Sequence, residues 1–99
     1  MATYLFQIAI TGKDTDDYVR DMRLQKEYIN VLLAENSVLA YGLADNEDTA
    51  WCVLNTKTKR QAINWIHSFP MYKYYGNIEC HTLSFHMSHP SLLVDISLN

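Results

Sequence analysis

The 99-residue sequence predicts a single α+β domain of the ferredoxin-like βαββαβ type, with a four-stranded antiparallel sheet that carries both helices on one face. Four segments show the residue alternation or the β-branched and aromatic content of strands. Two intervening segments repeat apolar residues at helical spacing. This order of elements, joined by right-handed crossovers, gives the predicted fold.

Near the N-terminus the spacing of apolar residues changes from every second residue to helical spacing, which predicts a strand followed by a helix. Residues 3–10 alternate in period two and predict a strand. An amphipathic pattern over 15–35 predicts a helix, which Asp14 or Thr15 can cap. Asn36 is suited to a left-handed C-terminal stop, so we expect the helix to end there.

The second half of the sequence repeats the strand and helix patterns. Strands are predicted over 38–43 and 50–55, with a polar link between them that suits a hairpin. A second helix is expected to begin at Thr56 or Thr58 and to stop before Pro70, because proline cannot continue a helix.

The C-terminal third is expected to contain a loop, a strand and a tail. Residues 71–76 predict an aromatic loop, and residues 77–86 predict the last strand. The single domain is therefore expected over 1–88. Residues 89–99 are too apolar for a disordered end, and we expect this tail to pack on a partner subunit.

Composition and charge narrow the functional classes. The net charge of −3 provides no basic surface for nucleic acid or for a membrane, so neither partner is predicted. The N-terminus lacks the features of a signal peptide. Two cysteines, Cys52 and Cys80, do not form a disulfide framework. The prediction is a cytoplasmic protein with reduced thiols.

The strands predict self-association, because they carry large apolar residues on both faces. Helices can cover only one face of the predicted sheet, and an apolar second face is unfavourable in water. Two-fold pairing with a second copy would cover that face. We therefore expect a homodimer, or a higher homo-oligomer, of the dimeric α+β barrel type.

The segment 69–83 resembles the end of the muconolactone isomerase-like proteins. In that family a short helix closes with an aliphatic or aromatic residue and proline, an aromatic loop follows, and a strand reads Asp-Ile-Glu-Val-x-x-Leu. Here Phe69 and Pro70 match the helix end, while Asn77 and Cys80 replace the aspartate and the valine. The resemblance implies the dimeric α+β barrel superfamily, which also includes dehalogenases, monooxygenases and YCII-type proteins.

Glu79 and His81 are the candidate catalytic residues. They lie two positions apart on the last predicted strand, so their side chains share a face about 7 Å apart. A carboxylate beside an imidazole can take and return a proton, which is the chemistry that lactone isomerisation requires. The alternative is that both side chains lie on a solvated rim, or that Glu79 has a structural role.

Several aromatic residues are candidates for a ligand pocket. Aromatic side chains with polar tips suit the wall of a site for a small planar ligand. The alternative is that they form core and dimer interface. The candidate ligand-binding residues are Tyr4, Tyr41, Trp51 and Tyr72.

A basic group at the start of the second helix is a candidate for binding a substrate carboxylate. It comprises Lys57, Lys59 and Arg60, which alternatively form a solvated surface. No metal site is predicted, because no histidine and cysteine spacing matches a zinc pattern. No other cofactor is predicted.

These features favour a cofactor-independent isomerase that moves a proton on a small unsaturated organic acid or lactone. Two alternatives stay open on the same fold. One is a non-catalytic protein that binds a small organic ligand or acts as an oligomeric scaffold. The other is a cofactor-independent monooxygenase, which also uses a dry aromatic pocket.

Overall fold

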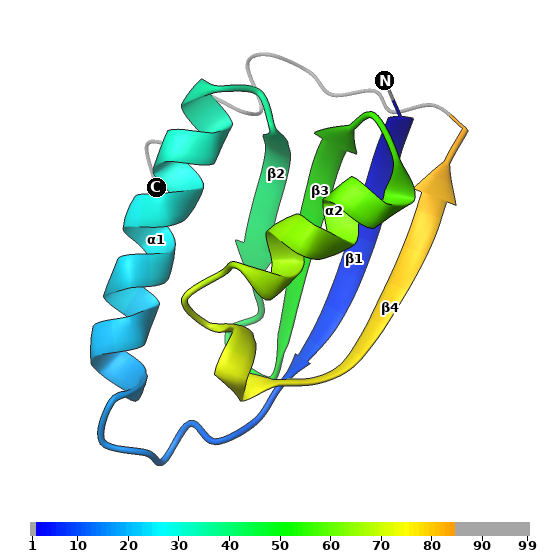
Figure 1. Ribbon diagram of the computed structural model, residues 1–99. Coiled ribbons are helices and arrows are strands. Elements are labelled where there is room, and N and C mark those ends of the chain that lie inside the picture. The colour runs from blue at the N-terminus through cyan, green and yellow to red at the C-terminus, as the bar shows by residue number, and fades with distance from the viewer. Residues whose placement is uncertain (1, 85–99) are drawn as a thin grey trace.

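The computed structural model describes residues 2–84 and shows one four-stranded sheet with two helices (Figure 1). The strands are β1 (Ala2–Ile10), β2 (Val38–Leu43), β3 (Thr49–Thr56) and β4 (Tyr75–Leu83). The helices are α1 (Tyr18–Ala34) and α2 (Lys59–His67). The strand order is β2-β3-β1-β4, and all neighbours are antiparallel. The predicted ferredoxin-like α+β fold is confirmed.

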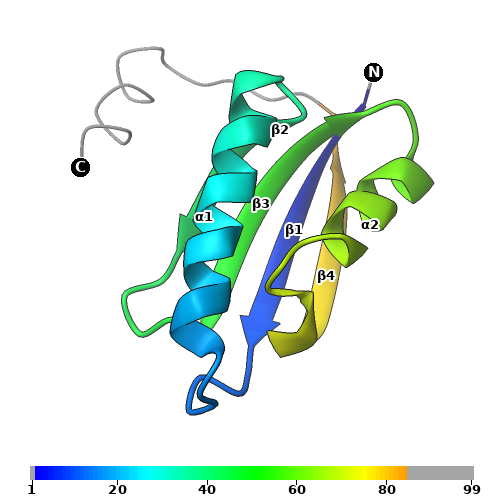
Figure 2. The ribbon, with the colours of Figure 1, turned by 60° about the vertical axis from the view of Figure 1, so that its left-hand side comes forward.

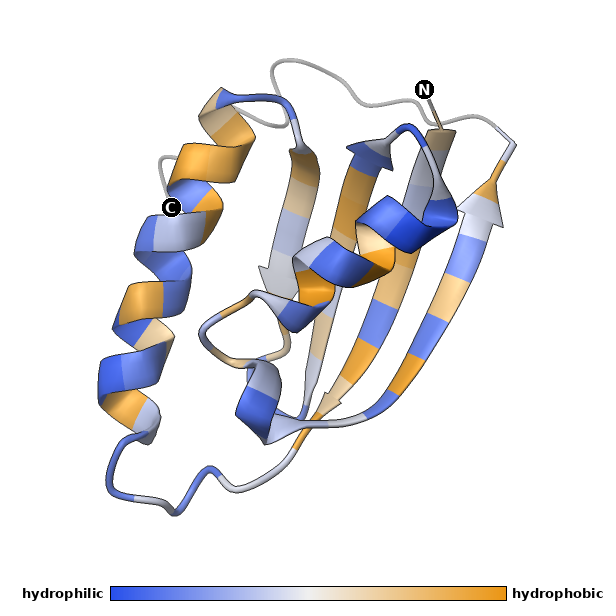
Figure 3. Ribbon diagram, in the orientation of Figure 1, coloured by the Kyte–Doolittle hydropathy of each residue, from blue (hydrophilic) through white to orange (hydrophobic). Residues whose placement is uncertain are grey.

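Both helices pack on the same face of the sheet, as Figure 1 and Figure 2 show. Hydrophobic residues recur along β1 (Figure 3), and every second residue from Tyr4 to Ile10 is buried. The core therefore fills the space between the sheet and the helices. The largest fully buried side chains include Phe6, Ile8, Leu32, Leu54 and Ile66. No helix within residues 2–84 combines the length and apolar character needed to cross a membrane.

Helix α1 begins at Tyr18, three residues later than the sequence predicted. The Thr15 hydroxyl donates a hydrogen bond to the Gly12 carbonyl at 2.8 Å instead of capping the helix. The residue at the N-cap position is Asp17, and its side chain makes no capping bond. The predicted stop is confirmed, since Asn36 has a φ of 64° directly after the helix.

Helix α2 begins with a reciprocal capping arrangement. The Thr58 hydroxyl oxygen accepts a hydrogen bond from the Gln61 backbone N–H at 3.1 Å. The Gln61 side chain in turn accepts one from the Lys57 backbone N–H at 3.0 Å. Of the two cap candidates, Thr58 is therefore the cap.

The segment predicted as an aromatic loop contains a short 3-10 helix, η1 (Tyr72–Tyr74). Strand β4 follows at once and begins at Tyr75, two residues earlier than predicted. The last residues predicted for this strand, 85–86, and the predicted tail, 89–99, lie outside the described residues.

Candidate functional site

Glu79 and His81 lie on the face of the sheet opposite the helices. On β1 the helix-facing residues are the buried ones, so Leu5 and Gln7 point to the other face. The register places Gln7 beside Glu79, and Leu5 beside His81. Both candidate catalytic side chains are exposed in the single chain, at the edge strand β4. The two share a face, as the prediction requires.

The same open face has an apolar centre. Trp51 lies across from Gln7, and Val53 lies across from Leu5. Trp51 is 39% exposed, while Val53 is only 9% exposed although neither α1 nor α2 covers it. Glu79 is therefore in the same cross-strand row as Trp51, with Gln7 between them. This face combines an apolar patch with a carboxylate and an imidazole at its border.

The other candidate ligand-binding residues do not lie on this face. Tyr4 is 6% exposed and belongs to the core on the helix side. Tyr41 is paired with the fully buried Cys52 and also points toward the helices. Tyr72 lies on η1, where its ring packs on His67 at 4.8 Å. The sheet separates Tyr4 and Tyr41 from Trp51, so the predicted residues do not line one common pocket within a single chain.

A buried glutamine that the sequence analysis did not select organises the helix side. Gln25 is fully buried, and its amide donates to the Tyr41 hydroxyl at 3.4 Å and to the Tyr75 hydroxyl at 3.2 Å. Its carbonyl oxygen accepts from the Met71 backbone N–H at 3.2 Å. Burial raises the pKa of both phenols, Tyr41 and Tyr75. Gln25 therefore holds two neutral tyrosines in place.

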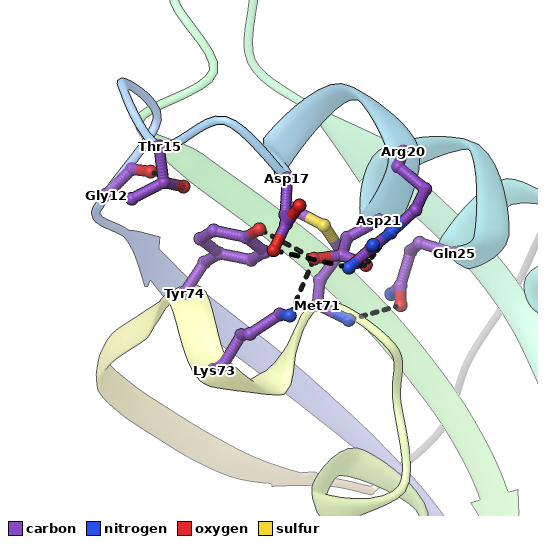
Figure 4. Close-up of polar contacts among 9 residues, drawn as sticks. All are labelled: Gly12, Thr15, Asp17, Arg20, Asp21, Gln25, Met71, Lys73 and Tyr74. Atoms are coloured by element: carbon purple, nitrogen blue, oxygen red, sulfur yellow. Dashed lines mark hydrogen bonds and ion pairs between the residues drawn. The ribbon is translucent and has the colours of Figure 1, made fainter.

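Asp21 forms a second polar cluster near the start of α1 (Figure 4). Its carboxylate accepts a hydrogen bond from the Tyr74 hydroxyl at 2.6 Å and pairs with Lys73 at 2.8 Å. Arg20 lies 3.3 Å away on the other carboxylate oxygen. The hydrogen bond from Lys73 and then that from Tyr74 lower the pKa of Asp21 to about 2. The cluster joins α1 to η1. Both oxygens of the Asp21 carboxylate already have partners within the cluster.

The sequence does contain a signal for these two clusters. The buried stripe of α1 consists of Tyr18, Asp21, Gln25, Ile29 and Leu32. Two polar residues at positions of an otherwise apolar stripe indicate buried polar contacts, because a buried polar group needs a partner. The identity of those partners was not predictable from local spacing, since Tyr41 lies 16 residues from Gln25, Tyr75 lies 50 residues from it, and Tyr74 lies 53 residues from Asp21.

A groove of about 400 Å³ runs between α2 and the edge strand β4. We call it the α2–β4 groove, and its lining residues are Phe6, Lys59, Ile63, Ile66, His67, Ile78 and Cys80. Of the basic group predicted at the start of α2, Lys59 lines this groove. Lys57 and Arg60 are exposed beside it.

The strand order, with both helices on one face of the sheet, defines a ferredoxin-like α+β protein. Among solved structures, muconolactone isomerase has the same fold, with a TM-score of 0.70 and 16% sequence identity. The similarity covers 91% of this chain and 95% of the isomerase. The resemblance seen in segment 69–83 is thus confirmed at the level of the fold.

A second similar structure is 5-chloro-2-hydroxyhydroquinone dehydrochlorinase from Burkholderia phenoliruptrix AC1100, in complex with 2,5-dihydroxybenzoquinone. Its TM-score is 0.64 at 10% identity, over 91% of this chain and 97% of the dehydrochlorinase. No protein-family model and no curated protein sequence matches this chain.

Proposed function

We propose that the protein is a cofactor-independent isomerase that moves a proton on a small unsaturated organic acid or lactone. The observation that carries the proposal is the pairing of Glu79 and His81 on the open sheet face, beside an apolar patch. The fold is that of an isomerase and a dehydrochlorinase, and both names describe reactions on small organic molecules.

The chemistry needs only a base and an acid. The Glu79 carboxylate removes a proton from the γ carbon of an α,β-unsaturated acid or lactone, and the C–H electron pair moves into a dienolate. His81, as the imidazolium, returns a proton to the far carbon of the dienolate, so the double bond shifts. Glu79 then releases its proton to water and His81 takes one up from water, which restores the carboxylate and the imidazolium. The reaction is redox-neutral and consumes no co-reactant.

A homodimer would complete this site. The apolar centre of the open face, formed by Leu5, Trp51 and Val53, favours burial against a second copy. Covering this patch would lower the local dielectric and leave Glu79 and His81 at the border of the interface. A substrate held at the border of the interface would then place its ring against the edge of the apolar patch and its reacting carbons near the two polar side chains.

Proton transfer can be measured without knowing the natural substrate. Muconolactone and other unsaturated lactones are incubated with the protein in D2O, and NMR follows deuterium incorporation and double-bond migration. We expect incorporation above the buffer rate, and we expect Glu79→Gln or His81→Ala to slow it by about 100-fold or more. Glu27→Gln, an exposed carboxylate on α1, is the matched control and should leave the rate unchanged.

Two outcomes would count against the proposal. Equal rates for the wild type and both variants would show that Glu79 and His81 do not handle the proton. Saturable binding of the lactones without any deuterium incorporation would favour a non-catalytic binding protein instead.

A further inference from the structure

The α2–β4 groove has an apolar floor and two polar ends. From α2 it receives four residues at spacings of four, three and one, which lie on one side of the helix: Lys59, Ile63, Ile66 and His67. Phe6 of β1 forms the floor, and Ile78 of β4 forms the opposite wall. The middle of the groove is therefore apolar over a length of two helical turns.

One end of the groove is cationic. Lys59 occupies the first position of α2, and within residues 2–84 it has no carboxylate within 4.0 Å. The Cys80 thiol lies at this end, where burial raises its pKa and the charge of Lys59 opposes that rise. An exposed cation that pairs with no carboxylate in the described part of the chain, above an apolar floor, is complementary to an anion that carries an apolar body.

At the other end of the groove, aromatic contacts hold the imidazole of His67. His67 lies eight residues after Lys59, which is about 12 Å along the helix axis. Its ring packs on Tyr72 at 4.8 Å, and Tyr72 packs on Tyr75 at 5.8 Å. This distance and the volume of about 400 Å³ match a ligand the size of a small aryl or alkyl carboxylic acid.

We infer that the α2–β4 groove binds a small monocarboxylic acid, with its carboxylate at Lys59 and its apolar body against Ile63, Ile66 and Ile78. The groove lies on the helix side of the sheet, whereas Glu79 and His81 lie on the opposite face. It is therefore distinct from the site proposed above.

Cys80 provides a direct reporter of occupancy. The sequence has two cysteines, and Cys52 is fully buried while Cys80 is partly exposed within the groove. The full-length protein is alkylated with N-ethylmaleimide, and mass spectrometry follows the modification rate of Cys80. Benzoate and hexanoate should slow this reaction saturably, while hexanamide, the neutral analogue, should protect about fivefold more weakly.

Matched variants separate a specific site from general charge attraction. Lys59→Gln should weaken protection by hexanoate about fivefold and leave protection by hexanamide unchanged. Lys57→Gln makes the same charge change two residues away, outside the groove lining, and should have no such effect.

Three results would overturn the inference. They are an absence of protection up to about 50 mM acid, equal protection by the acid and the amide, and equal weakening by Lys59→Gln and Lys57→Gln. The readout needs no turnover, so it can fail or succeed independently of the isomerase assay.

Discussion

At the scale of single residues, two polar side chains fix how α1 meets the rest of the fold. Asp21 is 4% exposed and Gln25 is fully buried, at positions where a helix facing a core is usually apolar. Each makes several hydrogen bonds, and among the described residues no buried side-chain nitrogen or oxygen lacks a partner. Their partners, Tyr74 and Met71, belong to the segment before β4. The two side chains therefore dock that segment on α1.

Asp21 makes stability depend on pH in a defined window. Its pKa falls from an ordinary value of 3.8 to about 2 in the folded protein, so the folded state favours the carboxylate. The stabilisation is fully present above pH 3.8 and is lost as the pH falls through about 2. Asp21→Asn should lower the free energy of unfolding at pH 7. It should also make that free energy fall less steeply between pH 3.8 and about 2. Urea unfolding at a series of pH values measures this, and a decline as steep as that of the wild type would contradict it.

At the scale of elements, α2 depends on its capping and packing. It has nine residues, which is too short for a helix to be stable alone. Thr58 and Gln61 satisfy backbone N–H groups at its start, and Ala62 and Ile66 bury its inner side. The same helix supplies one wall of the α2–β4 groove. The α2–β4 groove can therefore form only when α2 is folded.

Removal of the cap tests this dependence. Thr58→Ala deletes the oxygen that accepts from the Gln61 N–H, and we expect a loss of about 1 kcal/mol in the free energy of unfolding. Thr82→Ala, at an exposed position of β4, is the matched control and should change it by less than about 0.5 kcal/mol. Urea denaturation followed by circular dichroism gives both values. Equal effects of the two substitutions would show that the cap is energetically unimportant.

At the scale of the whole molecule, the two faces of the sheet have different roles. The helices cover one face and enclose the core, while the other face leaves Trp51 exposed beside Leu5 and Val53. In this small domain such a patch favours association. The proposed dimer and the proposed proton-transfer site both depend on this face.

A charge in the apolar centre should therefore disrupt the dimer. Trp51→Glu places one carboxylate from each copy in the interface, and we expect the dimer dissociation constant to rise by about 100-fold or more. Val31→Glu, on the exposed side of α1, should leave the dimer intact. Light scattering with size-exclusion chromatography over a dilution series measures the mass. A monomeric wild type, or a Trp51→Glu variant as dimeric as Val31→Glu, would refute this interface.

The sequence by itself determined the elements and their order, because apolar period and chain-breaking residues are local properties. Alternation of apolar residues predicted strands, and apolar residues at helical spacing predicted α1 and α2. Asn36 and Thr58 marked helix ends. The shared face of Glu79 and His81 also follows from local geometry, since they lie two residues apart on a regular strand.

Only the tertiary structure decided which side chains meet across the sheet. A register shift between β2 and β3, at Val38 and Ala40, puts Tyr41 on the helix side. A second register shift, between β1 and β4 at Ile8 and Ile10, puts Tyr75 on the same side. Such irregularities invert the alternation that a sequence pattern assumes. Gln25 could be placed beside these tyrosines, and Lys59 beside Cys80, only by the packing of distant segments. Local periodicity carries no information about that packing, because it depends on contacts between residues far apart in the chain.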